Sequence, residues 1–452
     1  MSHKLRPAIL ILILLLAICG CKRNYSHSEA ASSAEKTQNS APAEWSATDS
    51  DSGMVKDGWI HEFKDTNLNA LVTEAMKNNP DLQASAARVD QATALAKQAG
   101  AALQPSIGLG GRLSGTSSNE AAGAQGAGLG ISWEADVWGR LEQGRRSSEE
   151  SAKAVQADYE FARQSLAAAT ARNWFLLNEI EQQQEFLKSI VEILGKMNEL
   201  EKRKEKVGKV SMLEVSQVHA QLATAKDAVS QAEMARQQAS RSLEALIGRY
   251  PADELKGTGQ LPAKLPPIPA GQPSAILERR PDLIAAEDRV AAAFYAEKGA
   301  ELLHLPRFTF GAGAGISALG DAIAGLTAGI FAPLYTGGKI EAEIEQATAK
   351  QKETVANYAS VALNAFKEVE NGLSGENLLQ KREEYLTQAR TDKKKTYELA
   401  QIQYNVGKID LFELLSHQTA WIGSEISLLN IRRVRLDNRI DLHLALGGSF
   451  EQ

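Results

Sequence analysis

The sequence contains very little cysteine and few aromatic residues. Its only two cysteines, Cys19 and Cys21, lie close to the N-terminus. The rest of the chain therefore has no thiol for a disulfide, and its stability must come from packing and assembly. Aromatic residues make up 6% of the chain, whereas Ala, Gln, Glu and Lys recur throughout, a composition typical of long helices packed side by side.

The sequence also lacks the features of nucleic-acid-binding proteins and of enzymes. A net charge of -6 gives no concentrated basic face, so nucleic acid is not an expected partner. The seven histidines do not have the spacing of metal ligands. The glycine-rich runs 108–111 and 311–315 lack the Lys-Ser/Thr of a phosphate-binding loop. We therefore expect neither catalytic activity nor a metal or other cofactor.

The apolar run at residues 9–18 is too short for a permanent transmembrane helix and predicts a signal peptide over residues 1–20. The run ends in Ile18-Cys19-Gly20-Cys21, which resembles the lipobox of bacterial lipoproteins. A branched aliphatic residue stands three places before Cys21, and a small residue stands directly before it. The pattern predicts that Cys21 carries lipid, including palmitate. The alternative is an ordinary signal peptide with an incidental cysteine.

Composition and proline divide the remaining chain. Residues 21–57 are rich in Ser, Ala, Glu, Lys and Asp, which predicts a lipidated N-terminus and flexible tether. Proline is absent from 106 to 250 and from 334 onward, and the proline-rich segment 251–273 predicts an extended connector. We therefore expect two structural repeats, at 58–250 and 274–452.

Matching motifs indicate that the two repeats arose by duplication. Asn79-Pro80-Asp81-Leu82 corresponds to Arg280-Pro281-Asp282-Leu283 at a spacing of 201 residues. Val207-Gly208-Lys209 corresponds to Val406-Gly407-Lys408 at a spacing of 199. A constant register interrupted by one two-residue deletion is the pattern that an internal duplication leaves.

Each repeat contains two segments in which apolar residues alternate with small or polar ones. This period of two, over about ten residues, is typical of transmembrane β-strands. The alternative is a hairpin on a soluble core, but no other segment supplies a sheet for it to join, and an isolated hairpin is unstable. The segments lie within 106–114, 128–137, 308–317 and 325–334.

Four strands cannot close a membrane barrel, because the smallest such barrels have about eight. Unpaired strand edges in lipid would cost several kcal/mol for each free backbone group. The chain must therefore oligomerise, and three copies would provide about twelve strands around an open lumen.

Long helices make up most of each repeat. Residues 140–206 contain no proline and carry apolar residues at spacings of three and four, which predicts a helix of roughly 100 Å. A helix near 213–247 is expected to return antiparallel, and helices near 340–405 and 411–446 to repeat the arrangement. An alanine-rich helix at 81–103 precedes the first strand pair. The expected fold class is mainly α with a membrane β part.

This layout closely resembles the TolC-like outer membrane efflux family, especially its lipidated branch that works with resistance-nodulation-division pumps. The resemblance rests on the duplicated motifs, on the junction Trp133-Glu134-Ala135-Asp136-Val137-Trp138-Gly139-Arg140, and on its partner Pro333-Leu334-Tyr335-Thr336-Gly337-Gly338-Lys339. It implies a homotrimer with a twelve-stranded β-barrel in the outer membrane, continuous with an α-helical tunnel across the periplasm. It also implies a periplasmic adaptor (membrane fusion) protein and an inner-membrane transporter as partners.

The expected function is therefore the outer-membrane exit duct of a tripartite efflux system, anchored by lipid and extending into the periplasm. Two alternatives remain. One is the duct of a type I protein secretion system. The other is a non-conducting coiled-coil lipoprotein that spaces the envelope, although such a protein would not need amphipathic strand pairs.

The resemblance implies two sites at the far helix turns. Val207, Gly208, Lys209, Val406, Gly407 and Lys408 would meet the adaptor, although glycine after a helix end is also ordinary helix termination. Glu413 matches the position of acidic residues that constrict the closed tunnel end, with Asp410, Ser416 and His417 beside it. Relatives often carry Asp one turn later, where this chain has Ser416 and His417. The alternative role for Asp410 and Glu413 is helix capping.

Three charged residues fall on the small-residue face of the predicted strands. Arg112, Glu134 and Asp136 are expected to face the barrel lumen, where they would either bias the passing solutes or keep the lumen wetted.

Overall fold

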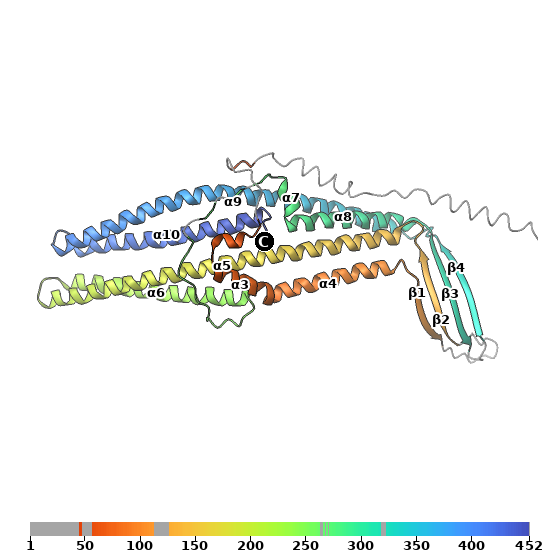
Figure 1. Ribbon diagram of the computed structural model, residues 1–452, viewed down its shortest axis with the longest axis horizontal. Helices are drawn as coiled ribbons and strands as arrows, with labels where there is room; N and C mark the ends of the chain where they lie inside the picture. The colour runs from red at the N-terminus through yellow and green to blue at the C-terminus, as the bar shows by residue number, and fades with distance from the viewer. Residues whose placement is uncertain are drawn as a thin grey trace, which may run out of the picture. The chain divides into compact units, whose positions relative to one another are not determined.

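The computed structural model describes residues 45–47, 57–112, 126–262, 265–266, 268–269, 271–317 and 322–451. The chain forms two compact units, whose helices and strands are labelled in Figure 1. The first contains Ala86–Asp158 and Asp282–Ala362, and the second contains Pro42–Ser85, Tyr159–Pro281 and Leu363–Gln452. Cys21 and most of the predicted tether lie outside the described residues.

The first unit contains a four-stranded antiparallel sheet in the order β1-β2-β3-β4. One hairpin comes from each repeat, and the two hairpins join through β2 and β3, where Trp133 lies opposite Phe310. β1 and β4 are the outer strands of this sheet. The strands are β1 (Ser106–Arg112), β2 (Gly126–Ala135), β3 (Arg307–Ser317) and β4 (Ala322–Phe331).

Helices enter and leave this sheet. α4 (Pro80–Ala101) leads into β1, and α8 (Pro281–Glu301) leads toward β3. α5 (Arg140–Lys206) and α9 (Lys339–Asn405) begin shortly after β2 and β4, and each has 67 residues. Within the first unit, the Ser147 hydroxyl of α5 donates to the Ala292 carbonyl of α8 at 2.9 Å.

In the second unit, α5 and α9 each pair with a returning helix. α6 (Met212–Leu246) follows α5, and α10 (Leu411–Ala445) follows α9. The four predicted long helices agree with these bounds to within one residue, whereas the helix predicted at 81–103 ends two residues earlier, at Ala101. The four helices share a core near their turns, formed by Ile190, Leu194, Val218, Leu222, Tyr397, Leu411, Leu414 and Trp421. No helix in the described ranges is both long enough and apolar enough to cross a membrane.

Four short elements were not predicted from the sequence: η2 (Trp59–Phe63), α3 (Thr66–Asn78), α7 (Ala275–Arg279) and η3 (Leu302–His304). The Asp65 side chain caps α3 by accepting the Asn67 and Leu68 amides. It also accepts a bond from the Trp174 indole of α5 at 2.7 Å. The apolar face of α3 lies in the core of the second unit, through Leu68, Leu71, Val72 and Ala75.

Candidate functional site: a glycine-lined sheet face and paired helix turns

The two faces of the sheet have different chemistry. One face presents large exposed apolar side chains, including Ile107, Leu109, Leu129, Leu326 and Ile330. Glycines and small hydroxyl residues alternate with them along every strand, among them Ser106, Gly108, Gly130, Ser132, Gly311, Gly313 and Thr327. One face is therefore suited to lipid, and the other leaves room for solute.

Aromatic residues gather where the strands meet the helices. Trp133 packs against Phe310 with ring centroids 6.0 Å apart, and Trp138 packs against Phe308 at 6.4 Å. The Trp133 indole donates to the Leu103 carbonyl at 2.9 Å, at the entry to β1. Tryptophan with an apolar ring and a satisfied N–H is typical of a membrane–water boundary.

Two of the three predicted lumen residues, Glu134 and Asp136, have local partners. Glu134 lies on the small-residue face of β2 and pairs with Arg140 at 2.6 Å. β2 ends one residue before Asp136, and the Asp136 carboxylate instead accepts the Leu141 and Glu142 amides at the start of α5. Arg112 is the last residue of β1, and its side chain lies outside the described part. A lumen role for these residues stays a prediction.

The two far turns have the same backbone geometry. Gly208 and Gly407 follow their helices with φ of 71° and 74°, the left-handed conformation that ends a helix. Lys209 donates its amide to the Lys204 carbonyl, and Lys408 donates to the Gln403 carbonyl, both at 2.9 Å. The valines before the glycines, Val207 and Val406, are exposed. These turns therefore present an apolar side chain and a lysine at each tip.

The helices after the turns are capped differently. Ser211 and Glu214 form a complete capping box on α6, and the bond from the Ser211 hydroxyl lowers the pKa of Glu214. On α10, the Asp410 side chain accepts the Glu413 amide at 2.8 Å. The Glu413 carboxylate points elsewhere, 3.9 Å from Nε2 of His417. Asp410 therefore acts as the cap, and the Glu413 side chain remains exposed with Ser416 nearby on the helix.

A polar link near the tips was not predicted from the sequence. Lys204 on α5 bonds to the fully buried Glu201 at 2.8 Å and to the Tyr404 hydroxyl of α9 at 3.2 Å. Burial opposes the charged form of Lys204, but these two bonds outweigh it and raise its pKa. Residues 200 positions apart share no periodic pattern that could have revealed the contact.

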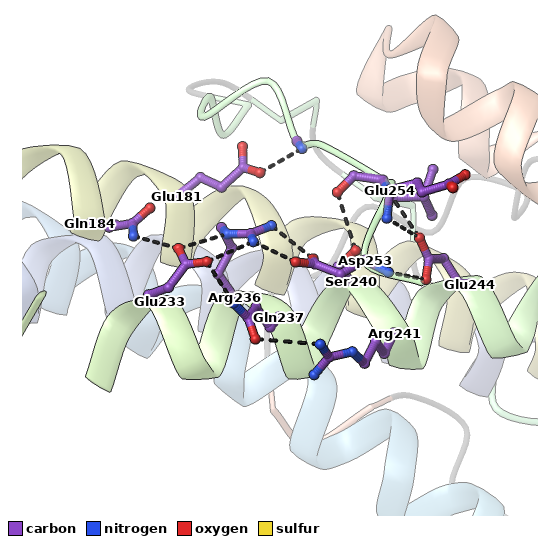
Figure 2. A network of polar contacts seen from close by, with 12 residues as sticks. Glu181, Gln184, Glu233, Arg236, Gln237, Ser240, Arg241, Glu244, Asp253 and Glu254 are labelled. Atoms are coloured by element: carbon purple, nitrogen blue, oxygen red, sulfur yellow. Dashed lines mark hydrogen bonds and ion pairs between the residues drawn. The ribbon is translucent and has the colours of Figure 1, made fainter. Parts of the chain in front are cut away.

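A second polar network, shown in Figure 2, fixes the start of the connector. The buried carboxylate of Glu244 on α6 accepts hydrogen bonds from the backbone amides of Asp253, Glu254 and Leu255. Burial alone would raise the pKa of Glu244, but these amide bonds lower it. Arg236 joins Asp253 to Glu233, and its bond to Glu233 holds the pKa of that carboxylate well below the usual range.

The sheet has one face suited to lipid and one suited to solute, and its strands are followed by long helices that form antiparallel pairs. This combination defines an outer-membrane channel subunit. The chain belongs to the outer membrane efflux protein family, whose model matches residues 71–249 and 272–448. It is an outer-membrane efflux protein, as the sequence predicted. In the described residues, no three His, Cys, Asp or Glu side chains are grouped to hold a metal.

Individual relatives match most of the chain. This chain is 28% identical over 437 residues to the pyoverdine export outer membrane protein OpmQ of Pseudomonas aeruginosa. The match covers 91% of this chain and 92% of that protein. This chain is also 28% identical to the toluene efflux pump outer membrane protein TtgC of Pseudomonas putida, covering 96% and 94%. The Campylobacter jejuni CmeC outer membrane channel has the same fold, with a TM-score of 0.82, 24% identity, and coverage of 88% and 89%.

Proposed function

We propose that three copies of this chain form one closed β-barrel and serve as the exit duct of a tripartite efflux system. The observation that carries this proposal is the four-stranded sheet with outer strands β1 and β4. Its apolar face requires lipid, and free strand edges are not stable in lipid. Pairing β1 of one copy with β4 of the next satisfies both edges.

The helices support the same assembly. α9 carries the exposed apolar residues Leu378, Tyr385 and Leu399 at multiples of seven residues, with Asp392 at the step between the last two, and Ile402 lies one turn beyond Leu399. A heptad stripe is the pattern by which one helix packs on another. An exposed stripe of this length indicates a partner, and a neighbouring copy with the same helix pairs fits it.

The far turns are the proposed docking site for a periplasmic adaptor that leads to an inner-membrane transporter. Each turn presents two exposed apolar residues at corresponding positions, Val207 with Leu213 and Val406 with Phe412. Lys209 and Lys408 lie beside them. Three copies would present six similar tips, which suits an adaptor that reads one repeated surface.

The remaining sites complete the proposal. Lipid on Cys21 anchors the chain in the outer membrane. Glu413, Ser416 and His417 contribute to a gate at the far end of the tunnel, while Asp410 caps α10. Glu134 and Arg112 contribute charge at the barrel, and the uncharged small residues around them give the duct little selectivity of its own.

Conductance across a planar bilayer tests this function. Gly130 has open space on the small-residue face, so Gly130→Trp would narrow a lumen without a clash inside the chain. We expect lower conductance for Gly130→Trp and unchanged conductance for Ile131→Trp on the opposite face. Assembled oligomers that conduct no ions would contradict an exit duct and favour a structural envelope lipoprotein.

A further inference from the structure

Two residues within the predicted tether, Trp45 and Ser46, lie against the body of the second unit. Trp45 is only 5% exposed, and its indole donates to the Gly271 carbonyl of the connector at 3.1 Å. Its ring lies 6.3 Å from the Phe366 ring of α9. The Ser46 amide donates to the Glu370 carboxylate, one turn further along α9, at 2.8 Å. This is a specific contact in a segment whose composition predicts a free chain.

The two repeats differ at this place. In the first repeat, α3 has 13 residues and precedes Asn79-Pro80, whereas in the second α7 has only five and precedes Arg280-Pro281. With the spacing of 201, the first turns of α3 correspond to connector residues around Gly271, which the structure does not place in a helix. In the described residues, the second repeat therefore has only a short counterpart of the helix that α3 forms in the first.

The corresponding surfaces of α5 and α9 also differ between the two repeats. Ala167 and Ala171 of α5 are fully buried in the core to which α3 belongs. With the spacing of 199, these two positions correspond to Phe366 and Glu370 of α9. The residues that receive Trp45 and Ser46 thus correspond to residues that are buried in the core containing α3 in the first repeat. A larger ring and a carboxylate replace the two alanines there.

We propose that Trp45 and Ser46 are a folded plug that completes the second repeat by occupying on α9 the place that α3 occupies on α5. Trp45 supplies apolar area and Ser46 supplies a backbone donor, while Gly271 and Glu370 supply the two acceptors. The plug also fastens the segment following Cys21 to α9 and to the connector. This inference is independent of the proposed transport function.

Hydrogen exchange of the full-length protein tests the plug. An amide bonded within folded structure exchanges more slowly than one in a free chain. We expect the Ser46 amide to exchange at least about tenfold more slowly than a free amide, and Trp45→Ala to remove this protection. Trp45→Phe should retain part of it, because the ring remains while the bond to Gly271 is lost. A Ser46 amide that exchanges as a free chain, or protection that survives Trp45→Ala, would overturn the proposal.

Cross-linking provides a readout that does not depend on a destabilised variant. In a background with Cys19→Ser and Cys21→Ser the chain has no other thiol, so Ser46→Cys with Glu370→Cys should be joined by a short bifunctional thiol-reactive reagent. Ser46→Cys with Glu384→Cys is the matched control, because Glu384 is exposed on the same helix but roughly 20 Å further along it. Equal cross-linking of both pairs would show that the segment wanders over α9, and no cross-link in either would show that it does not dock.

Discussion

Asn79 and Arg280 occupy corresponding positions in the two repeats and make the same contact. The Asn79 side chain donates to the Leu246 carbonyl at 2.9 Å, and the Arg280 guanidinium donates to the Ala445 carbonyl at 3.2 Å. Each therefore ties the start of one helix, α4 or α8, to the end of a returning helix. Asn79 also caps α4 through the Leu82 amide, whereas Arg280 pairs with Glu368. The two corresponding positions therefore make the same contact with different residue types.

The glycine that follows each returning helix makes this contact possible. Gly248 has a φ of 78°, and a Cβ atom there would lie 2.5 Å from the Asn78 carbonyl oxygen. We expect Gly248→Ala to destabilise the chain by roughly 2–4 kcal/mol, through backbone strain and this clash, as measured by the unfolding midpoint. Gly208→Ala is the control, because Gly208 has a similar φ but open space around it, so only about 1 kcal/mol should be lost. Equal losses of stability in the two variants would show that the close approach of Gly248 to the Asn78 carbonyl does not contribute.

Burial of a carboxylate on α10 should make stability depend on pH. Burial raises the pKa of Asp437 to about 6 although Arg433 pairs with it. A raised acid pKa contributes stability that is present below the unfolded value and is lost as pH rises through about 6. We expect Asp437→Asn to have a higher unfolding midpoint than the natural chain at about pH 7.5. At about pH 4 the two midpoints should be equal. A pH-independent difference would contradict this.

A substitution at Glu142 provides the opposite control. Bonds from Arg145 first, and then from Arg146, lower the pKa of Glu142 to about 2. A lowered acid pKa contributes stability above the unfolded value, and this is lost as pH falls toward about 2. Glu142→Gln should therefore lower the midpoint near neutral pH, and the deficit should shrink in acid.

The exposed apolar residues at the turns should bind the adaptor. We expect Val207→Ser combined with Leu213→Ser to weaken binding of the cognate adaptor at least about tenfold, because desolvated apolar anchors dominate such interfaces. Titration of the purified channel with adaptor measures this directly. Met234→Ser, at an exposed position elsewhere on α6, is the control for a general loss of apolar surface. Unchanged affinity in the double variant would place the docking site elsewhere.

The exposed Glu413 carboxylate should matter for the closed state of the duct. We expect Glu413→Ala to raise the conductance of the resting channel, because its charge would no longer narrow the passage. Glu214 is the corresponding residue of the first repeat, and its carboxylate bonds to the Ser211 amide at 2.9 Å. Glu214→Ala should therefore lower stability and leave conductance unchanged. Raised conductance in Glu214→Ala together with unchanged conductance in Glu413→Ala would instead assign the gate to the first repeat.

The long elements could be predicted from the sequence because their signals are local. α5 spans Arg140–Lys206 as expected, since it contains no proline and its apolar residues keep a helical period. α3 was missed although Leu68, Leu71, Val72 and Ala75 have helical spacing. Its short length, just before Pro80, gave too few turns to distinguish it from a loop.

The contacts between distant segments could not be predicted. Lys204 with Tyr404, and Trp45 with Gly271, join residues separated by 200 and 226 positions. Neither pair belongs to a motif or a period, so only the folded chain brings them together. Composition predicts a polar tether over residues 21–57, but it gives no indication that Trp45 within this range docks on the folded chain.

The proposed exit duct requires that three copies of the chain share one closed barrel. The mass of the detergent-extracted protein on a semi-native gel, with and without heating, tests this requirement most directly in the natural chain and in Cys21→Ser. We predict a heat-sensitive trimer of about 150 kDa in both, because strand pairing rather than lipid closes the barrel. A monomer in both would leave β1 and β4 with unpaired edges in lipid and would contradict a barrel shared between copies.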